Sequence, residues 1–184
     1  MKKIISVLLA VLLLFSFAAC AKEEVAEETT EAAETTDSEK ITGMIYGVFD
    51  NDANNILSTE FSCNGGDITV ERIAAGLSGW TGLKFRVKVT TDEENKKITI
   101  NWLPESSLMT GEIPETQREE FTFADADAMR VFMLNSLCYS VRASLGEYDI
   151  YFTADGADIS TLALEGLSSE TAFNKTESSI VFVK

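Results

Sequence analysis

The clearest pattern in the chain is an alternation of apolar and polar positions in two neighbouring segments. Polar residues fill the positions between the apolar ones, and the polar stretch 91–96 joins the two segments. Because successive side chains of a strand point to opposite faces, this pattern predicts a β-hairpin with one buried face. The apolar positions are Leu83, Phe85, Val87 and Val89 in the first segment and Ile98, Ile100 and Trp102 in the second.

Apolar residues spaced three and four apart predict one helix on each side of this hairpin. The first helix begins behind Thr69 or Asp67 as its N-cap and is expected to stop at Gly79. The second spans residues 125–145, opens with an Asp-rich turn and ends at Gly146. The apolar stripes are Val70, Ile73, Ala74 and Leu77 in the first helix and Leu134, Leu137, Cys138, Val141 and Leu145 in the second.

Segments rich in β-forming residues complete the predicted fold, and residues 104–120 are expected to form a long loop. The order of strands and helices implies a single α+β domain over residues 41–184. We expect a mixed, mostly antiparallel sheet with two helices packed on one face, because the hairpin needs only one covered face. The additional strands are predicted at residues 41–49, 56–63, 148–153 and 180–183.

Residues 1–19 have the pattern of a bacterial lipoprotein signal peptide. Two lysines precede a short apolar run over residues 4–17, which is shorter than a typical membrane-spanning helix. The run ends in Phe-Ala-Ala-Cys at residues 17–20, which resembles the lipobox, where small residues precede the cysteine that receives a diacylglycerol. We therefore expect a lipid on Cys20 that holds the protein on the outer face of the bacterial cytoplasmic membrane. An ordinary signal peptide cut before this cysteine and an uncleaved anchor are the alternatives.

Residues 20–40 consist almost wholly of Glu, Ala and Thr and are predicted to form an acidic tether. The segment has almost nothing apolar to bury, and repulsion between its carboxylates keeps it extended. In the whole chain 30 acidic residues stand against 15 basic ones, which gives a net charge of −15. Such a surface repels nucleic-acid phosphates and anionic lipid headgroups. Nucleic-acid binding is therefore not expected, and attachment to a membrane requires the lipid on Cys20.

The chain contains no histidine, which removes several common kinds of catalytic site. Ser-His-Asp and Cys-His arrangements and imidazole-ligated zinc cannot be built, and neither a nucleophile motif nor a glycine-rich phosphate loop occurs. We therefore expect a protein that is not an enzyme and has no catalytic residue, metal or cofactor. Asp50, Asp52 and Asn54 have the spacing of calcium ligands. Asn55 replaces the required glycine, however, and Phe61 replaces the bidentate glutamate, so a capped turn is expected there.

Six short segments, which are mostly turns and packing positions, occur in an order that matches a known domain. They are Ala75–Gly79, Thr81–Leu83, Ile98–Trp102, Ser106–Leu108, Met133–Leu137 and Tyr151–Gly156. Together they resemble the GerMN domain of sporulation and spore-germination lipoproteins, over residues 41–159, although residues 80–82 replace the family's proline-containing segment. The resemblance implies a non-enzymatic domain related to the ring-building α/β modules that assemble envelope complexes during sporulation. It therefore implies self-association or an envelope protein partner, in sporulation or germination.

Four further residues are candidates for a covalent bond or a ligand contact. Cys63 and Cys138 are the remaining thiols, and the sequence leaves open whether they form a disulfide. The position of Cys138 on an apolar helical stripe favours free thiols. In an alternative function, the lipoprotein binds a cell-wall glycan or a small solute, and Trp102 and Tyr151 stack on its rings. Alternation places Tyr151 on the face of its strand opposite to Phe152.

Overall fold

Two separate β-sheets form the two outer layers of the fold in the computed structural model, which describes residues 40–49, 55–164 and 166–175. The first sheet is an antiparallel pair of β1 (Lys40–Val48) and β2 (Ile56–Asn64). The second sheet has the strand order β3-β4-β5-β6. Its strands are β3 (Val87–Asp92), β4 (Lys97–Trp102), β5 (Asp149–Ala154) and β6 (Ala157–Asp158).

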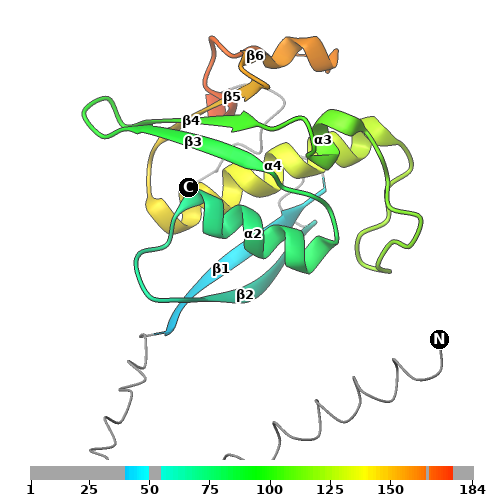
Figure 1. Cartoon of the computed structure of the whole chain (residues 1–184), viewed down its shortest axis with the longest axis horizontal. Helices are drawn as coiled ribbons and strands as arrows, with labels where there is room; N and C mark the ends of the chain where they lie inside the picture. Colours follow the sequence, from blue (N-terminus) through cyan, green and yellow to red (C-terminus); the bar gives the residue numbers. More distant parts are fainter. Residues whose placement is uncertain (1–39, 50–54, 165, 176–184) are drawn as a thin grey trace, which may run out of the picture. The chain divides into compact units, whose positions relative to one another are not determined.

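Two helices, α2 (Val70–Thr81) and α4 (Ala126–Leu145), lie between the two sheets (Figure 1). α4 connects β4 to β5, which pair in parallel, whereas the other neighbouring strands pair antiparallel. The predicted α+β class, with a mixed, mostly antiparallel sheet and two helices, is confirmed. The antiparallel pair of β1 and β2 is not part of that sheet, however, and covers the opposite side of the helices. The shorter helical segments are α3 (Ser107–Thr110), η2 (Ile159–Leu162) and η3 (Phe173–Lys175).

The predicted central hairpin is confirmed as β3 and β4, with the connection at residues 93–96. Every second residue of β4 and of β5 is buried, in agreement with the alternation in the sequence. Leu83 and Phe85 are also buried, but they precede the first residue of β3. One face of the second sheet therefore contributes to the core, and the other carries the polar positions.

The end of α2 differs from the prediction, because the helix continues through Gly79 to residue 81. Thr69 is the N-cap, as expected, and its hydroxyl accepts the amide of Arg72 at 3.3 Å. Beyond Gly79, the indole of Trp80 packs edge-on against Phe121, so the last turn gains apolar contacts that offset the cost of the glycine. The helix ends at residue 82, a glycine with a φ of 81°, whose amide donates to the carbonyl of residue 78.

α4 has the predicted bounds, with the carboxylate of Asp125 accepting the amide of Ala128 at 2.8 Å and Gly146 at its end. The predicted apolar stripe is buried, and a second stripe on the opposite side of the helix is buried as well. This second stripe contains Ser136 and Ser140, which contact β1. α4 is therefore covered on two sides, whereas the sequence pattern predicted one.

Residues 104–120 do not form the one long loop that the sequence predicted, because they contain a short helix and a buried side chain. Ser106 caps the short helix α3, whose Leu108 is fully buried. Phe121 is buried directly after this segment. Within residues 40–49, 55–164 and 166–175, no helix is both long and apolar enough for a membrane span. The signal segment, residues 20–39 of the tether, the calcium-like spacing at 50–54 and the predicted strand 180–183 lie outside the described residues. Residue 40, the last of the predicted tether, is the first residue of β1.

Candidate functional site

β3 is the edge strand of the second sheet, so one side of its backbone has no neighbouring strand among the residues that the structure describes. The amide of Leu103 donates to the carbonyl of Arg86 at 2.9 Å, which fixes the alternation of hydrogen bonds between β3 and β4. In an antiparallel pair the intervening residues direct their backbone groups away from the partner strand. These outward-facing N–H and C=O groups belong to Val87, Val89 and Thr91.

The open part of this edge begins after Phe85. At the start of the segment, the hydroxyl of Ser78 on α2 accepts the amide of Phe85 at 2.9 Å. This bond provides the hydrogen-bond partner that a neighbouring strand would otherwise supply. No corresponding bond from α2 reaches the outward groups of residues 87–91 within the described part of the chain. The free edge is therefore confined to β3 itself.

Two hollows lie side by side along the open edge, with volumes of about 540 Å³ and about 350 Å³. Glu71, in the first turn of α2, borders both of them. The apolar side chains of their walls are Ala75, Phe85, Val87 and Leu103 in the larger hollow and Ile68, Val70, Val89, Ile98 and Leu145 in the smaller one. We refer to the two hollows and the free edge of residues 87–91 as the β3 groove.

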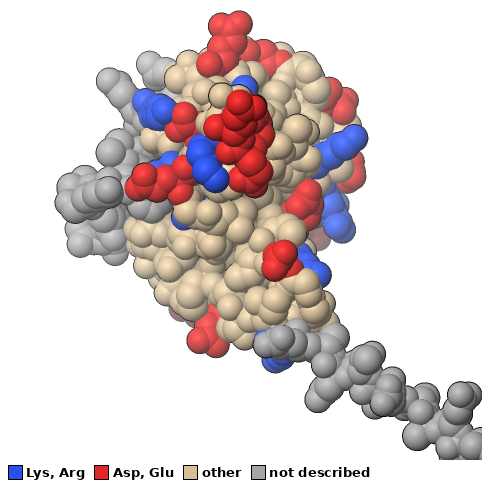
Figure 2. All heavy atoms as spheres, turned by 90° about the vertical axis from the view of Figure 1, so that its left-hand side faces the viewer, with Lys and Arg blue, Asp and Glu red and all other residues tan. Residues whose placement is uncertain are grey.

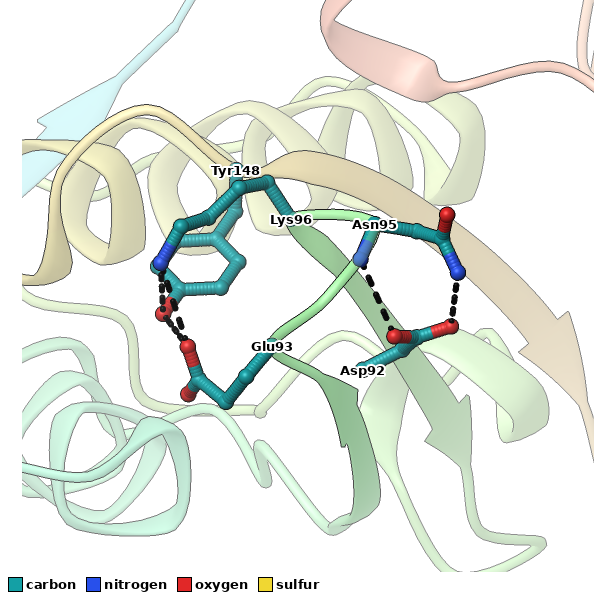
Figure 3. Close-up of polar contacts among 5 residues, drawn as sticks. All are labelled: Asp92, Glu93, Asn95, Lys96 and Tyr148. Atoms are coloured by element: carbon teal, nitrogen blue, oxygen red, sulfur yellow. Dashed lines mark hydrogen bonds and ion pairs between the residues drawn. The ribbon is translucent and has the colours of Figure 1, made fainter.

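A cluster of polar contacts holds the β3–β4 turn at one end of the β3 groove (Figure 3). The hydroxyl of Tyr148 donates to Glu93 at 2.5 Å, and the ammonium group of Lys96 donates to the same carboxylate at 3.2 Å. The Tyr148 hydrogen bond, and then that of Lys96, lower the pKa of Glu93 below its ordinary value. Asp92 accepts two hydrogen bonds from Asn95, which lower its pKa as well. The turn is therefore tied to the segment between α4 and β5, and Glu93 stays ionised.

Charge is distributed unevenly around the β3 groove. Figure 2 views the molecule from the left-hand side of Figure 1, where the β3–β4 turn projects, and shows acidic and basic side chains close together. Carboxylates border the two hollows, and Arg86 also lines the larger one. Basic residues alternate with apolar ones along β3 and the residues before it. The carboxylates are Glu71, Glu93 and Glu105, and the exposed basic residues are Lys84, Arg86 and Lys88.

The two aromatic residues that the sequence suggested as ligand contacts occupy different places. Trp102 has an exposed fraction of 0% and packs between Phe85 and Phe152. Its indole therefore belongs to the core, and the prediction that Trp102 contacts a ligand is wrong. Tyr151 is half-buried on the polar face of the second sheet, opposite to Phe152, as predicted. The ammonium group of Lys97 lies 4.1 Å from the centre of the Tyr151 ring. A sugar ring could stack on that side of Tyr151 only after displacing this cation.

The two cysteines are free thiols in the structure, so the disulfide that the sequence left open is not formed. Cys63 lies on β2, where Arg72 donates to its sulfur at 3.3 Å. Cys138 belongs to the apolar stripe of α4 that faces away from β1 and β2. A disulfide requires Cα atoms within about 7 Å and side chains that point toward each other, which this arrangement does not allow.

Thiol labelling of the full chain with Cys20→Ser is expected to distinguish the two cysteines. Burial raises the pKa of Cys138 to about 12, so this thiol is protonated and inaccessible to a thiolate-specific reagent at pH 8. We expect the half-exposed Cys63 to react in the folded protein and Cys138 to react only after unfolding in urea. Mass spectrometry of the labelled peptides measures both. Failure of both thiols to react in urea until a reductant is added would instead indicate a disulfide.

Comparisons with known proteins identify no relative: no family model, no curated protein and no solved structure matches this chain. The residues of the β3 groove were not identified from the sequence as a site. In this part of the sequence, basic and apolar residues alternate at positions 83–88. This alternation predicts a strand, but it does not predict whether the strand lies at the edge of a sheet.

Proposed function

We propose that this chain is a membrane-anchored envelope lipoprotein whose domain binds a protein partner and catalyses no reaction. A lipid on Cys20 holds it on the outer face of the bacterial cytoplasmic membrane. The single observation that supports the interaction role best is the β3 groove, because a free strand edge beside apolar walls offers both backbone hydrogen bonds and burial to a protein segment. The resemblance to GerMN domains supports a setting in sporulation or germination.

The alternative of a glycan-binding or solute-binding lipoprotein receives less support from the positions of the aromatic residues. Trp102 is enclosed in the core, and Lys97 lies over the ring of Tyr151. Glycan recognition generally uses an aromatic face that is open to the sugar. We therefore keep the protein-binding function as the proposal.

Labelling with radioactive palmitate tests the anchor. In the bacterium that makes this protein, we expect the full chain to incorporate the label and to remain in the membrane fraction. Cys20→Ser is expected to abolish the labelling, because the acceptor thiol is lost. Cys63→Ser is the matched control and should be labelled like the wild-type chain. A labelled Cys20→Ser variant, or an unlabelled wild-type chain, would show that the anchor is assigned wrongly.

Site-specific photo-crosslinking of the full chain in living cells tests the interaction. A photoreactive residue is placed at Thr91 in the β3 groove, at Glu60 on β2 or at Glu119 after α3, all of which are exposed. We expect one envelope protein to be crosslinked repeatedly from at least one of these surfaces. The interaction function is wrong if no position crosslinks to a protein and the chain is recovered only with peptidoglycan.

A further inference from the structure

We propose that the β3 groove binds an extended segment of a partner protein in which acidic and apolar residues alternate, and that this segment adds to the second sheet as a strand beside β3. The inference rests on the proposed protein-binding function and specifies the chemistry of the partner. Three properties of the groove support it: its backbone groups, the apolar walls of its hollows and the charges on its two sides.

The backbone of β3 supplies the hydrogen bonds for an added strand. Val87, Val89 and Thr91 direct their N–H and C=O groups away from β4, and the described part of the second sheet ends at β3. This free edge is five residues long, which corresponds to about 17 Å of extended chain. An extended segment of about five residues can therefore pair along it over its whole length.

The side chains of an added strand would point alternately to the two faces of the sheet, and each face has its own requirement. On one face they would lie over the two hollows, whose walls include apolar side chains and whose borders carry Glu71, Glu93 and Glu105, with Arg86 beside the larger one. These carboxylates repel acidic side chains, so apolar residues fit there. On the other face the side chains would lie beside the exposed Lys88, with which acidic residues form favourable cross-strand pairs.

The same charges argue against a second copy of this chain as the occupant. If two β3 strands paired edge to edge, the basic side chains of both copies would lie next to each other on the same face of the joined sheet. Like charges on neighbouring strands are destabilising. The net charge of −15 on each copy adds a further repulsion. Lysines on an edge strand are a common means of preventing such self-pairing, and they do not oppose an acidic partner.

A synthetic peptide of four Val-Glu repeats is the probe, and its binding to the full chain in detergent is measured by fluorescence anisotropy. We expect saturable binding of this peptide and no binding of the Val-Lys version. Methylation of the peptide amides that face β3 should abolish binding, because those amides lose their hydrogen. A peptide methylated on the alternate amides, which face solvent, is the matched control and should still bind. Equal binding of both methylated peptides would overturn the proposal.

Charge reversal on β3 tests the acidic preference. Lys88→Glu is expected to weaken binding of the Val-Glu peptide by about tenfold, because it replaces an attractive cross-strand pair with a repulsive one. Lys40→Glu makes the same change of net charge on β1 of the first sheet and should leave binding unchanged. Both lysines are exposed, so neither variant disturbs the core. Equal affinities of the two variants would contradict the assigned position of the peptide.

Hydrogen–deuterium exchange shows which backbone groups the peptide contacts. The amides of Val87, Val89 and Thr91 should exchange quickly in the free chain and slowly with peptide, whereas those of Lys88 and Thr90 should be protected in both states. Slow exchange of the outward amides before peptide is added would mean that another part of this chain, such as the tether or the predicted strand 180–183, or a second copy fills the groove, which contradicts the proposal. If crosslinking from Glu60 or Glu119 captures an envelope protein while the peptide does not bind, the protein-binding function stands and the β3 groove is the wrong site.

Discussion

Phe132→Ala is expected to lower the free energy of unfolding by about 3–5 kcal/mol, because it opens a cavity in the largest aromatic cluster of the core. Phe132 is fully buried, and its ring centre lies 4.8 Å from that of Phe49, 5.0 Å from that of Phe123 and 5.7 Å from that of Phe121. These rings come from α4, from the residue that follows β1 and from the segment before α4. Their common packing therefore joins the first sheet to the helical layer. Urea unfolding followed by circular dichroism measures the loss.

Two control variants separate the cavity from other effects of the substitution. Phe132→Leu retains most of the buried volume and should cost less than about 1.5 kcal/mol. Met44→Ala truncates a large apolar side chain that is 37% exposed and should change stability by about 0.5 kcal/mol or less. If Phe132→Ala cost no more than Met44→Ala, the aromatic cluster would not be closely packed.

The elements of the second sheet could be predicted from the sequence because one property, the period of apolar residues, determines them. Ile98, Ile100 and Trp102 alternate with polar residues, and all three are buried on one face of β4. The end of α2 could not be predicted in this way. Both Gly79 and Gly82 are plausible helix terminators in the sequence, and the choice between them depends on the contact of Trp80 with a residue far along the chain.

The candidate site could not be predicted because the sequence pattern does not show which strand lies at an edge. The alternation at residues 83–89 would be the same for a central strand and for an edge strand. Only the strand order of the second sheet shows that the outward backbone groups of β3 have no neighbouring strand among the described residues. Trp102 illustrates the converse error, since an aromatic residue can suggest a ligand contact although its own alternation places it in the core.

The second buried stripe of α4 was missed for a related reason: the residues of this stripe that contact β1 include serines, which a search for apolar periodicity ignores. The hydroxyl of Ser140 accepts the amide of Tyr46, and that of Ser136 accepts the amide of Val48, each at 2.9 Å. These two hydroxyls, one helical turn apart, accept amides on the side of β1 that has no neighbouring strand within the described residues.

The double variant Ser136→Ala/Ser140→Ala is therefore expected to lower the free energy of unfolding by about 2–5 kcal/mol, because two strand amides lose their acceptors where both serines are fully buried. The higher helix propensity of alanine offsets about 0.5 kcal/mol per position.

Ser144→Ala, one turn further along α4, is the control that measures this offset. The hydroxyl of Ser144 is more exposed, and its hydrogen bond to the Met44 carbonyl is long, at 3.5 Å, so little is lost when it is removed. We expect Ser144→Ala to be neutral or slightly stabilising. Faster exchange of the Tyr46 and Val48 amides in the double variant should accompany the loss of stability. Unchanged exchange would show that these serines do not hold β1 against the helix.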